Sequence, residues 1–150
     1  NMIEKIISQY DIICLQELFT NLTVNNKEWL QYLSKKYKYN IIYDSNLSLP
    51  KMLGSGLAIL TKYRINYNNF YLFKNSKNAD KYSNKGILTA NIQINDKTLN
   101  IHNIHLQAYY KNNPDILYPQ IKELRANIKS NYILTGDFNV NPFIIEQFLE

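Results

Sequence analysis

Two side chains near the end of the sequence, Asp137 and Asn139, have the types and spacing of a phosphate-handling pair. They close the run Ile133-Leu-Thr-Gly-Asp-Phe-Asn139, in which an apolar, strand-like segment ends at a glycine. Because side chains alternate along an extended backbone, we expect Asp137 and Asn139 to project together from the strand end. A carboxylate acceptor beside an amide suits a phosphate and its metal ion. A turn is the alternative, since Gly-Asp and Asn-Pro pairs are common in turns.

A second candidate ligand, Glu17, stands after another apolar run. Asp11-Ile-Ile-Cys-Leu15 predicts a short buried strand, and Gln16-Glu17 follows it directly. Packing gives a poor reason for a carboxylate at a strand end, so we interpret Glu17 as a hard oxygen ligand for Mg²⁺, or for Mn²⁺. An ordinary exposed glutamate that opens a loop is the alternative.

Both histidines of the chain lie in one predicted strand, over residues 98–107. Alternation places His105 on one face with Asn103 and Gln107, and His102 on the opposite face. A lone histidine in a strand is usually structural, but His105 lies nearer the strand end, where loops and ligands gather. We therefore choose His105 over His102 as the site residue.

Together these side chains could supply most of what metal-assisted hydrolysis of a phosphodiester needs. Such a reaction needs carboxylates for a metal ion, a base for water, hydrogen-bond donors for the developing charge and help for the leaving group. The candidate residues for these tasks are Glu17, His105, Asp137 and Asn139.

Apolar spacing predicts the elements that would position these residues. It indicates helices over residues 3–10, 27–37 and 114–129, with Pro119 in the true first turn of the last helix, where proline is tolerated. Strands are predicted over residues 11–17, 39–43, 56–62, 70–73, 86–94, 98–107 and 133–137. Residues 95–97 should form a hairpin turn, 45–55 and 75–84 should be loops, and 144–149 begin a further helical pattern.

The order of these elements predicts a single domain over residues 1–150. Its class is α/β (α+β), a layered sandwich of mostly antiparallel sheets flanked by helices. The single cysteine, Cys14, excludes an internal disulfide and is expected to be a small core residue. No run of about 18 apolar residues and no signal-peptide pattern occurs in the sequence, and nothing in it specifies a cellular compartment.

The formal net charge of +5 would suit a polyanion or an anionic membrane surface. Lysine dominates this charge, however, and the only arginines are Arg64 and Arg125. The lysines are dispersed along the chain, in a composition rich in Asn, Ile, Lys and Tyr. We therefore give the charge little weight as a signal for nucleic acid.

Four motifs in their order along the chain resemble the endonuclease/exonuclease/phosphatase superfamily. They are Leu15-Gln-Glu17, Gly54-Ser-Gly-Leu-Ala-Ile-Leu60, Ile104-His-Leu-Gln107 and Gly136-Asp-Phe-Asn139. The resemblance implies that Glu17 is the metal-binding glutamate. It also implies that Asp137 and Asn139 orient water and the phosphate. His105 would contact the phosphate and help to protonate the leaving group.

Within that superfamily the chain looks most similar to the neutral sphingomyelinase-like branch. The similarity rests on Glu17-Leu-Phe19, Ser83-Asn-Lys-Gly86 and His105-Leu-Gln-Ala108. It implies that Lys85 joins His105 and Asn139 in binding substrate, and that the partner is a phospholipid or a membrane surface. For Asn84-Lys-Gly86 a plain turn is the alternative.

Members of the superfamily also have an N-terminal strand with an active-site asparagine and a late Asp-His pair. This sequence has no such strand before its first helix and no histidine after His105. We therefore expect it to be the middle of a longer, partial catalytic domain with little turnover on its own, since the base is absent. The alternatives are a Mg²⁺-dependent nuclease of the same fold, for which nucleic acid is the partner, and a catalytically inactive fragment. No oligomeric state is predicted.

Overall fold

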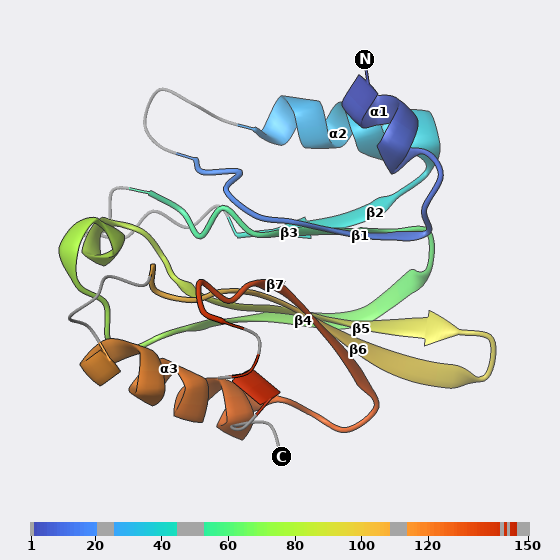
Figure 1. The fold of residues 1–150 in the computed structure, drawn as a ribbon. Helices are drawn as coiled ribbons and strands as arrows, with labels where there is room; N and C mark the ends of the chain where they lie inside the picture. Colours follow the sequence, from blue (N-terminus) through green and yellow to red (C-terminus); the bar gives the residue numbers. More distant parts are fainter. Residues whose placement is uncertain are drawn as a thin grey trace.

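The computed structural model describes residues 2–20, 26–44, 53–108, 114–141, 143 and 145–146. Within these residues the chain forms four layers (Figure 1). Helices α1 (Met2–Ile7) and α2 (Lys27–Tyr37) lie over one sheet, a second sheet packs against the first, and helix α3 (Pro114–Asn127) covers the outer face of the second sheet. The predicted layered α/β sandwich is confirmed.

The first sheet contains three antiparallel strands in the order β1-β3-β2. Their bounds are Ile12–Leu15 for β1, Ala58–Thr61 for β3 and Asn40–Tyr43 for β2. Side-chain alternation gives the central strand two apolar faces. Ala58 and Leu60 pack toward α1 and α2, whereas Leu57 and Ile59 pack toward the second sheet. This strand is fully buried because both of its faces are covered.

The second sheet contains four strands in the order β4-β5-β6-β7. Their bounds are Arg64–Leu72, Gly86–Ile94, Lys97–His105 and Tyr132–Asp137. β4, β5 and β6 are antiparallel, and the two-residue turn Asn95-Asp96 between β5 and β6 confirms the predicted hairpin. β7 pairs with β6 in parallel, with α3 in the connection between them. Parallel pairing brings the carboxyl ends of β6 and β7, and thus His105 and Asp137, to one edge.

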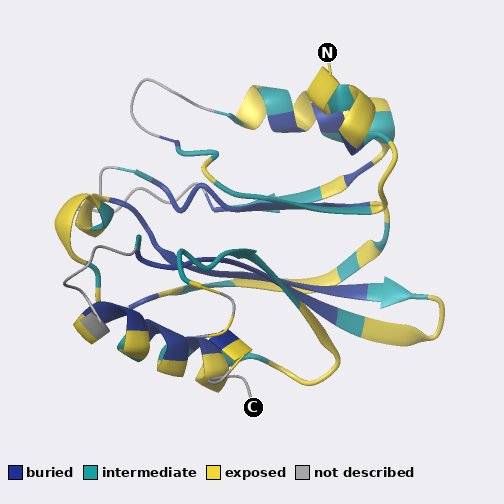
Figure 2. Cartoon of the chain, viewed as in Figure 1, coloured by how far each residue is buried: buried dark blue, intermediate teal, exposed yellow. Residues whose placement is uncertain are grey.

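Three apolar layers hold the sandwich together. Figure 2 shows buried residues along strands of both sheets and on the side of α3 that faces the second sheet. The layer between the two sheets includes Ile59, Ala90 and Ile101, all at most 1% exposed. Cys14 is half-buried against this layer, as expected for a core residue. Burial raises the pKa of its thiol to about 12, so its thiolate form is scarce at neutral pH.

The two histidines lie on opposite faces of β6, as the alternation predicts. The His102 ring is buried on the α3 side, where Thr89 Oγ1 contacts Nδ1 at 2.9 Å and the Lys129 amide donates to Nε2 at 3.4 Å. Burial lowers its pKa, and the charge of Lys129 lowers it further. His102 is therefore a satisfied structural residue, and His105 faces the other sheet.

Three sequence predictions about the elements were wrong. Pro119 lies inside α3, which begins at Pro114, because tertiary packing of the helix overrides a missing N–H. β4 spans nine residues rather than residues 70–73, since it is an edge strand on which polar side chains remain exposed. Residues 75–84 include the short 3₁₀ helix Asn78–Tyr82 rather than only loop. The predicted loop at 45–52 and the helical pattern at 144 and 147–149 lie outside the described residues.

Candidate metal and phosphate site

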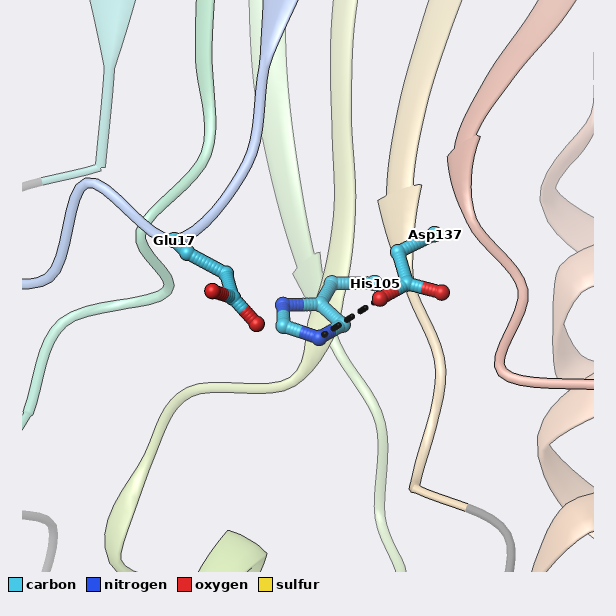
Figure 3. Close-up of side chains that lie close together, drawn as sticks. All are labelled: Glu17, His105 and Asp137. Atoms are coloured by element: carbon cyan, nitrogen blue, oxygen red, sulfur yellow. Dashed lines mark ion pairs between the residues drawn. The ribbon is translucent and has the colours of Figure 1, made fainter.

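Three acidic or imidazole side chains from distant parts of the sequence converge at one edge of the sandwich. Ligand atoms of Glu17, His105 and Asp137 lie within 4.8 Å of one another. Figure 3 shows the Glu17 carboxylate on one side of the His105 ring and the Asp137 carboxylate on the other. The structure thus brings together three of the four residues that the sequence singled out for metal and proton chemistry.

The strand pairing explains why His105 and Asp137 meet. They are partners in the parallel ladder of β6 and β7, and each ends its strand. His105 Nε2 lies 3.7 Å from Asp137 Oδ2. The His105 side chain is 2% exposed, whereas that of Asp137 is 41% exposed. The pair therefore combines a buried ring with a carboxylate that solvent or a ligand can reach.

Glu17 reaches the site from the first sheet. It follows β1 by two residues and has a φ of 61°, in the left-handed region that non-glycine residues seldom adopt. Leu18 N donates to Gly56 O at 2.9 Å, which holds this turn against the segment before β3. The turn directs an exposed carboxylate toward the His105 ring.

Lys85, predicted to contact substrate, lies beside His105. Its Nζ is 2.6 Å from His105 Nε2 and 3.4 Å from Asp80 Oδ1, and the ammonium group is almost fully buried. Burial lowers the pKa of Lys85, while the charge of Asp80 opposes that shift. Burial also lowers the pKa of His105, and the charge of Lys85 lowers it further. These directions favour a neutral His105 whose Nε2 accepts a hydrogen bond from the lysine.

Asp80 is a site residue that the sequence reasoning missed. Its Oδ2 accepts hydrogen bonds from Gln107 Nε2 at 2.6 Å and from Ala108 N at 2.8 Å, so both the carboxylate and its partner Lys85 are fixed. The segment before Lys85 is polar and was expected to be plain loop. The sequence signal that could have identified Asp80 as a site residue is that it is the only carboxylate between Lys74 and Lys85.

Asn139 lies near the site, but the predicted geometry was wrong. Its φ is 53°, so the backbone is not extended and strand alternation does not apply. Its N–H donates to Asp137 Oδ1 at 2.9 Å, and its side-chain amide donates to Leu106 O at 2.9 Å. The turn alternative therefore describes the backbone here, and this turn orients the Asp137 carboxylate.

The two carboxylates of the site fit a hard divalent cation. Glu17 and Asp137 offer the oxygen atoms that such ions prefer. Lys85 occupies the region of His105 Nε2, and its positive charge disfavours a second cation there. Glu17 and Asp137 are therefore the residues that could hold a metal, and the ammonium group of Lys85, beside His105, gives the site a cationic part suited to a phosphate.

We expect Lys85→Met to raise the pKa of His105. The substitution removes the cation next to the ring, and the charges of Asp137 and Glu17, which favour the imidazolium, remain. NMR titration of the His105 ring in the complete protein measures this shift.

Lys129→Met is the matched control, since the Lys129 charge acts on His102 instead. The control should raise the pKa of His102 and leave that of His105 unchanged. A His105 pKa that stays constant or falls in Lys85→Met would contradict the assigned contact.

The chain is similar to known proteins over most of its length. A family model described as the endonuclease/exonuclease/phosphatase family matches residues 1–146. A sphingomyelinase of Dictyostelium discoideum is 29% identical over 180 residues, covering 92% of this chain and 39% of that protein. A sphingomyelinase C of Bacillus cereus is 31% identical over 164 residues, covering 93% and 49%. The chain therefore spans less than half the length of these relatives.

Solved structures show the same fold. Sphingomyelinase C from Streptomyces griseocarneus superposes with a TM-score of 0.77 at 18% identity, covering 97% of this chain and 60% of that one. A variant of the Staphylococcus aureus beta toxin with bound magnesium ions gives a TM-score of 0.77 at 22% identity, with the same two coverages. Among the described residues, no helix is long enough and apolar enough to cross a membrane.

Proposed function

Because the chain belongs to the endonuclease/exonuclease/phosphatase family, we propose that the complete protein is a metal-dependent phosphodiesterase that hydrolyses a phospholipid head group, as a sphingomyelinase does. The observation that carries this proposal is the convergence of Glu17, His105 and Asp137 within 4.8 Å, beside the buried ammonium group of Lys85. Carboxylates for a metal and cationic groups for a phosphate are the two halves of such a site.

Each side chain has a role in this proposal. The accessible carboxylate of Asp137 orients the attacking water. Lys85 and His105 face the phosphate oxygens, where a positive charge stabilises the developing negative charge. Asn139 fixes the Asp137 carboxylate through its backbone N–H. Its side-chain amide donates one N–H to Leu106 O, and the second N–H is proposed to bind the phosphate.

Glu17, with Asp137, would hold the metal, for which Mg²⁺ is proposed and Mn²⁺ is the substitute. When bound, the ion would act as a Lewis acid on the phosphate. Glu17 is suited to this because it is exposed and acts from the sheet opposite His105, so an ion can reach it without displacing the Lys85–His105 contact.

A phospholipid is the proposed substrate class, and a phospholipid or membrane surface is the proposed partner. The support comes from relatives named as sphingomyelinases over 92–93% of this chain. The net charge of +5 is compatible with an anionic surface of either kind, lipid or nucleic acid. A nuclease of the same fold is therefore the alternative outcome of the test.

The test compares two substrates with the complete protein. We expect release of phosphocholine from sphingomyelin vesicles in Mg²⁺, abolished by a chelator, and a fall of about 100-fold or more in Glu17→Gln. Glu28→Gln, which removes an exposed glutamate of the first turn of α2, should keep full activity.

Three outcomes decide the assignment. Hydrolysis of duplex DNA without hydrolysis of lipid would assign the nuclease alternative. Lipid hydrolysis that survives both the chelator and Glu17→Gln would remove the metal from the proposal. Absence of hydrolysis on both substrates would contradict a phosphodiesterase.

A further inference from the structure

The side chain of Asn103 joins the two sheets next to the candidate site. Asn103 lies in β6 and is 0% exposed. Its Nδ2 donates to Leu15 O at 2.9 Å and to Ala58 O at 3.0 Å, and its Oδ1 accepts from Gln16 Nε2 at 2.7 Å. All three hydrogen bonds therefore run from the second sheet to the first, at the point where Leu15 pairs with Ala58.

These hydrogen bonds can fix the position of one sheet relative to the other. Apolar packing alone defines that position poorly. The rest of the layer between the sheets is built from side chains such as Ile59, Ala90 and Ile101, whose contacts have no preferred direction. A buried, fully bonded amide is directional and specifies one arrangement. Asn103 is therefore the directional element in an otherwise apolar interface.

The position of Asn103 along its strand relates this register to the site. His105 lies two residues after Asn103 on the same face of β6, and Glu17 lies two residues after Leu15. The hydrogen bond from Asn103 to Leu15 thus aligns two short segments that each lead into the site. A shift of one sheet along the other would move the Glu17 carboxylate away from His105 and Asp137.

The backbone of Glu17 shows why such alignment is needed. Its left-handed φ of 61° is strained for a residue with a Cβ, and persists only where the surroundings hold it. On one side, Asn103 holds the preceding Gln16. On the other, an added Cβ at Gly56 would lie 3.1 Å from Glu17 Cα, so the two segments are in close contact.

We propose that Asn103 and Gln16 are positioning residues, which hold Glu17 in the place where it binds the metal. This inference rests on the proposed function, in that Glu17 is taken as a metal ligand. The amide groups of Asn103 and Gln16 act through the backbone of the Glu17 turn. They do not contact the reacting atoms themselves. They are called the inter-sheet clamp below.

The test measures metal affinity and turn order in the complete protein. Asn103→Leu removes all three bonds at similar volume, and Gln16→Met removes only the bond to Gln16. We expect the Kd for Mn²⁺, measured by electron paramagnetic resonance, to rise about 10- to 100-fold in Asn103→Leu, with Gln16→Met at the lower end of that range. In metal-free protein the Leu18 amide, bonded to Gly56 O, should exchange its hydrogen faster in both variants.

Asn100→Leu is the matched control. Asn100 lies on the same strand and is also buried, and its side chain also makes three hydrogen bonds: it accepts from Asn91 and Tyr67 and donates to Ser130 O. None of these partners leads to Glu17. Asn100→Leu should lower the stability of the fold without changing Mn²⁺ affinity or Leu18 exchange.

The outcomes separate the clamp from the proposed function. If Glu17→Gln binds Mn²⁺ as tightly as the unchanged protein, the metal assignment fails and the inference fails with it. If Glu17→Gln weakens binding but Gln16→Met and Asn103→Leu do not, the clamp alone is overturned. An equal loss of affinity in Asn100→Leu would also overturn it. Should Asn103→Leu not fold, Gln16→Met, at a half-buried position, decides between these results.

Discussion

Replacing Asp137 with Asn should reduce kcat of the complete protein about 100-fold or more, because the variant loses the carboxylate that is proposed to orient the attacking water and to hold the metal with Glu17. The change removes the negative charge that lies 3.7 Å from His105 Nε2 and that is open to solvent. An amide keeps an oxygen that can accept the hydrogen bond from Asn139 N, so the turn after β7 should survive. The measurement is steady-state hydrolysis, together with urea unfolding to show that the fold persists.

Asp11→Asn provides the control for this substitution. Asp11 also pairs with a cation, Lys62, at 2.9 Å, but it lies before β1, at the end opposite the Glu17 turn, and its side chain is 59% exposed. Its loss should change kcat less than twofold, because exposed ion pairs contribute little. If Asp137→Asn kept more than a tenth of the activity, Asp137 would not be the group that orients the attacking water.

Replacing Gly136 with Ala should destabilise the fold by about 3 kcal/mol or more, one of the largest effects expected of a single methyl group. Gly136 has a φ of 135°, and an added Cβ would lie 2.1 Å from Ile104 O and 2.6 Å from Ile104 N. These are backbone atoms of the neighbouring strand and cannot rotate away. Since Ile104 and Gly136 are paired one step before His105 and Asp137, the substitution would also separate that pair.

Urea unfolding of Gly136→Ala and Gly54→Ala tests this expectation. A Cβ at Gly54 would meet its nearest atom, Asp44 O, at 3.3 Å, and Gly54 is not among the positive-φ residues. Gly54→Ala should therefore change stability by only about 1 kcal/mol or less. An equal loss of unfolding free energy in the two variants would contradict the prediction. It would show that the close approach of β6 and β7 at Gly136 does not cause the loss of stability.

Much of the site could be read from side-chain alternation. The prediction that His105 and His102 occupy opposite faces of one strand is correct because β6 is regular over its whole length. Asp137 ends β7, as predicted, whereas Glu17 lies in a turn two residues beyond the end of β1 rather than in the strand itself. The roles assigned to these residues stay predictions.

Side-chain contacts between different segments could not be predicted from the sequence. Asp80 is tied to Lys85 and to Gln107 through side-chain hydrogen bonds that no local pattern encodes. Asn139 departs from the extended backbone because it bonds to the Asp137 carboxylate, and a sequence that fits both a strand end and a turn does not decide between them. Asn103 looked like one polar residue in a strand, although it joins two sheets.

The parallel pairing of β6 with β7 has a consequence for how the molecule folds. Glu17 and Asp137 lie near opposite ends of these 150 residues, and β7 can dock only after α3 has crossed over the sheet. Such non-local contacts form late, because the entropy of closing a long loop is lost before they are gained. During synthesis, Glu17, Lys85 and His105 would leave the ribosome well before their acidic partner. The carboxylates of Glu17 and Asp137 therefore meet only in the folded sandwich, and a divalent ion would stabilise the native state rather than guide the chain toward it.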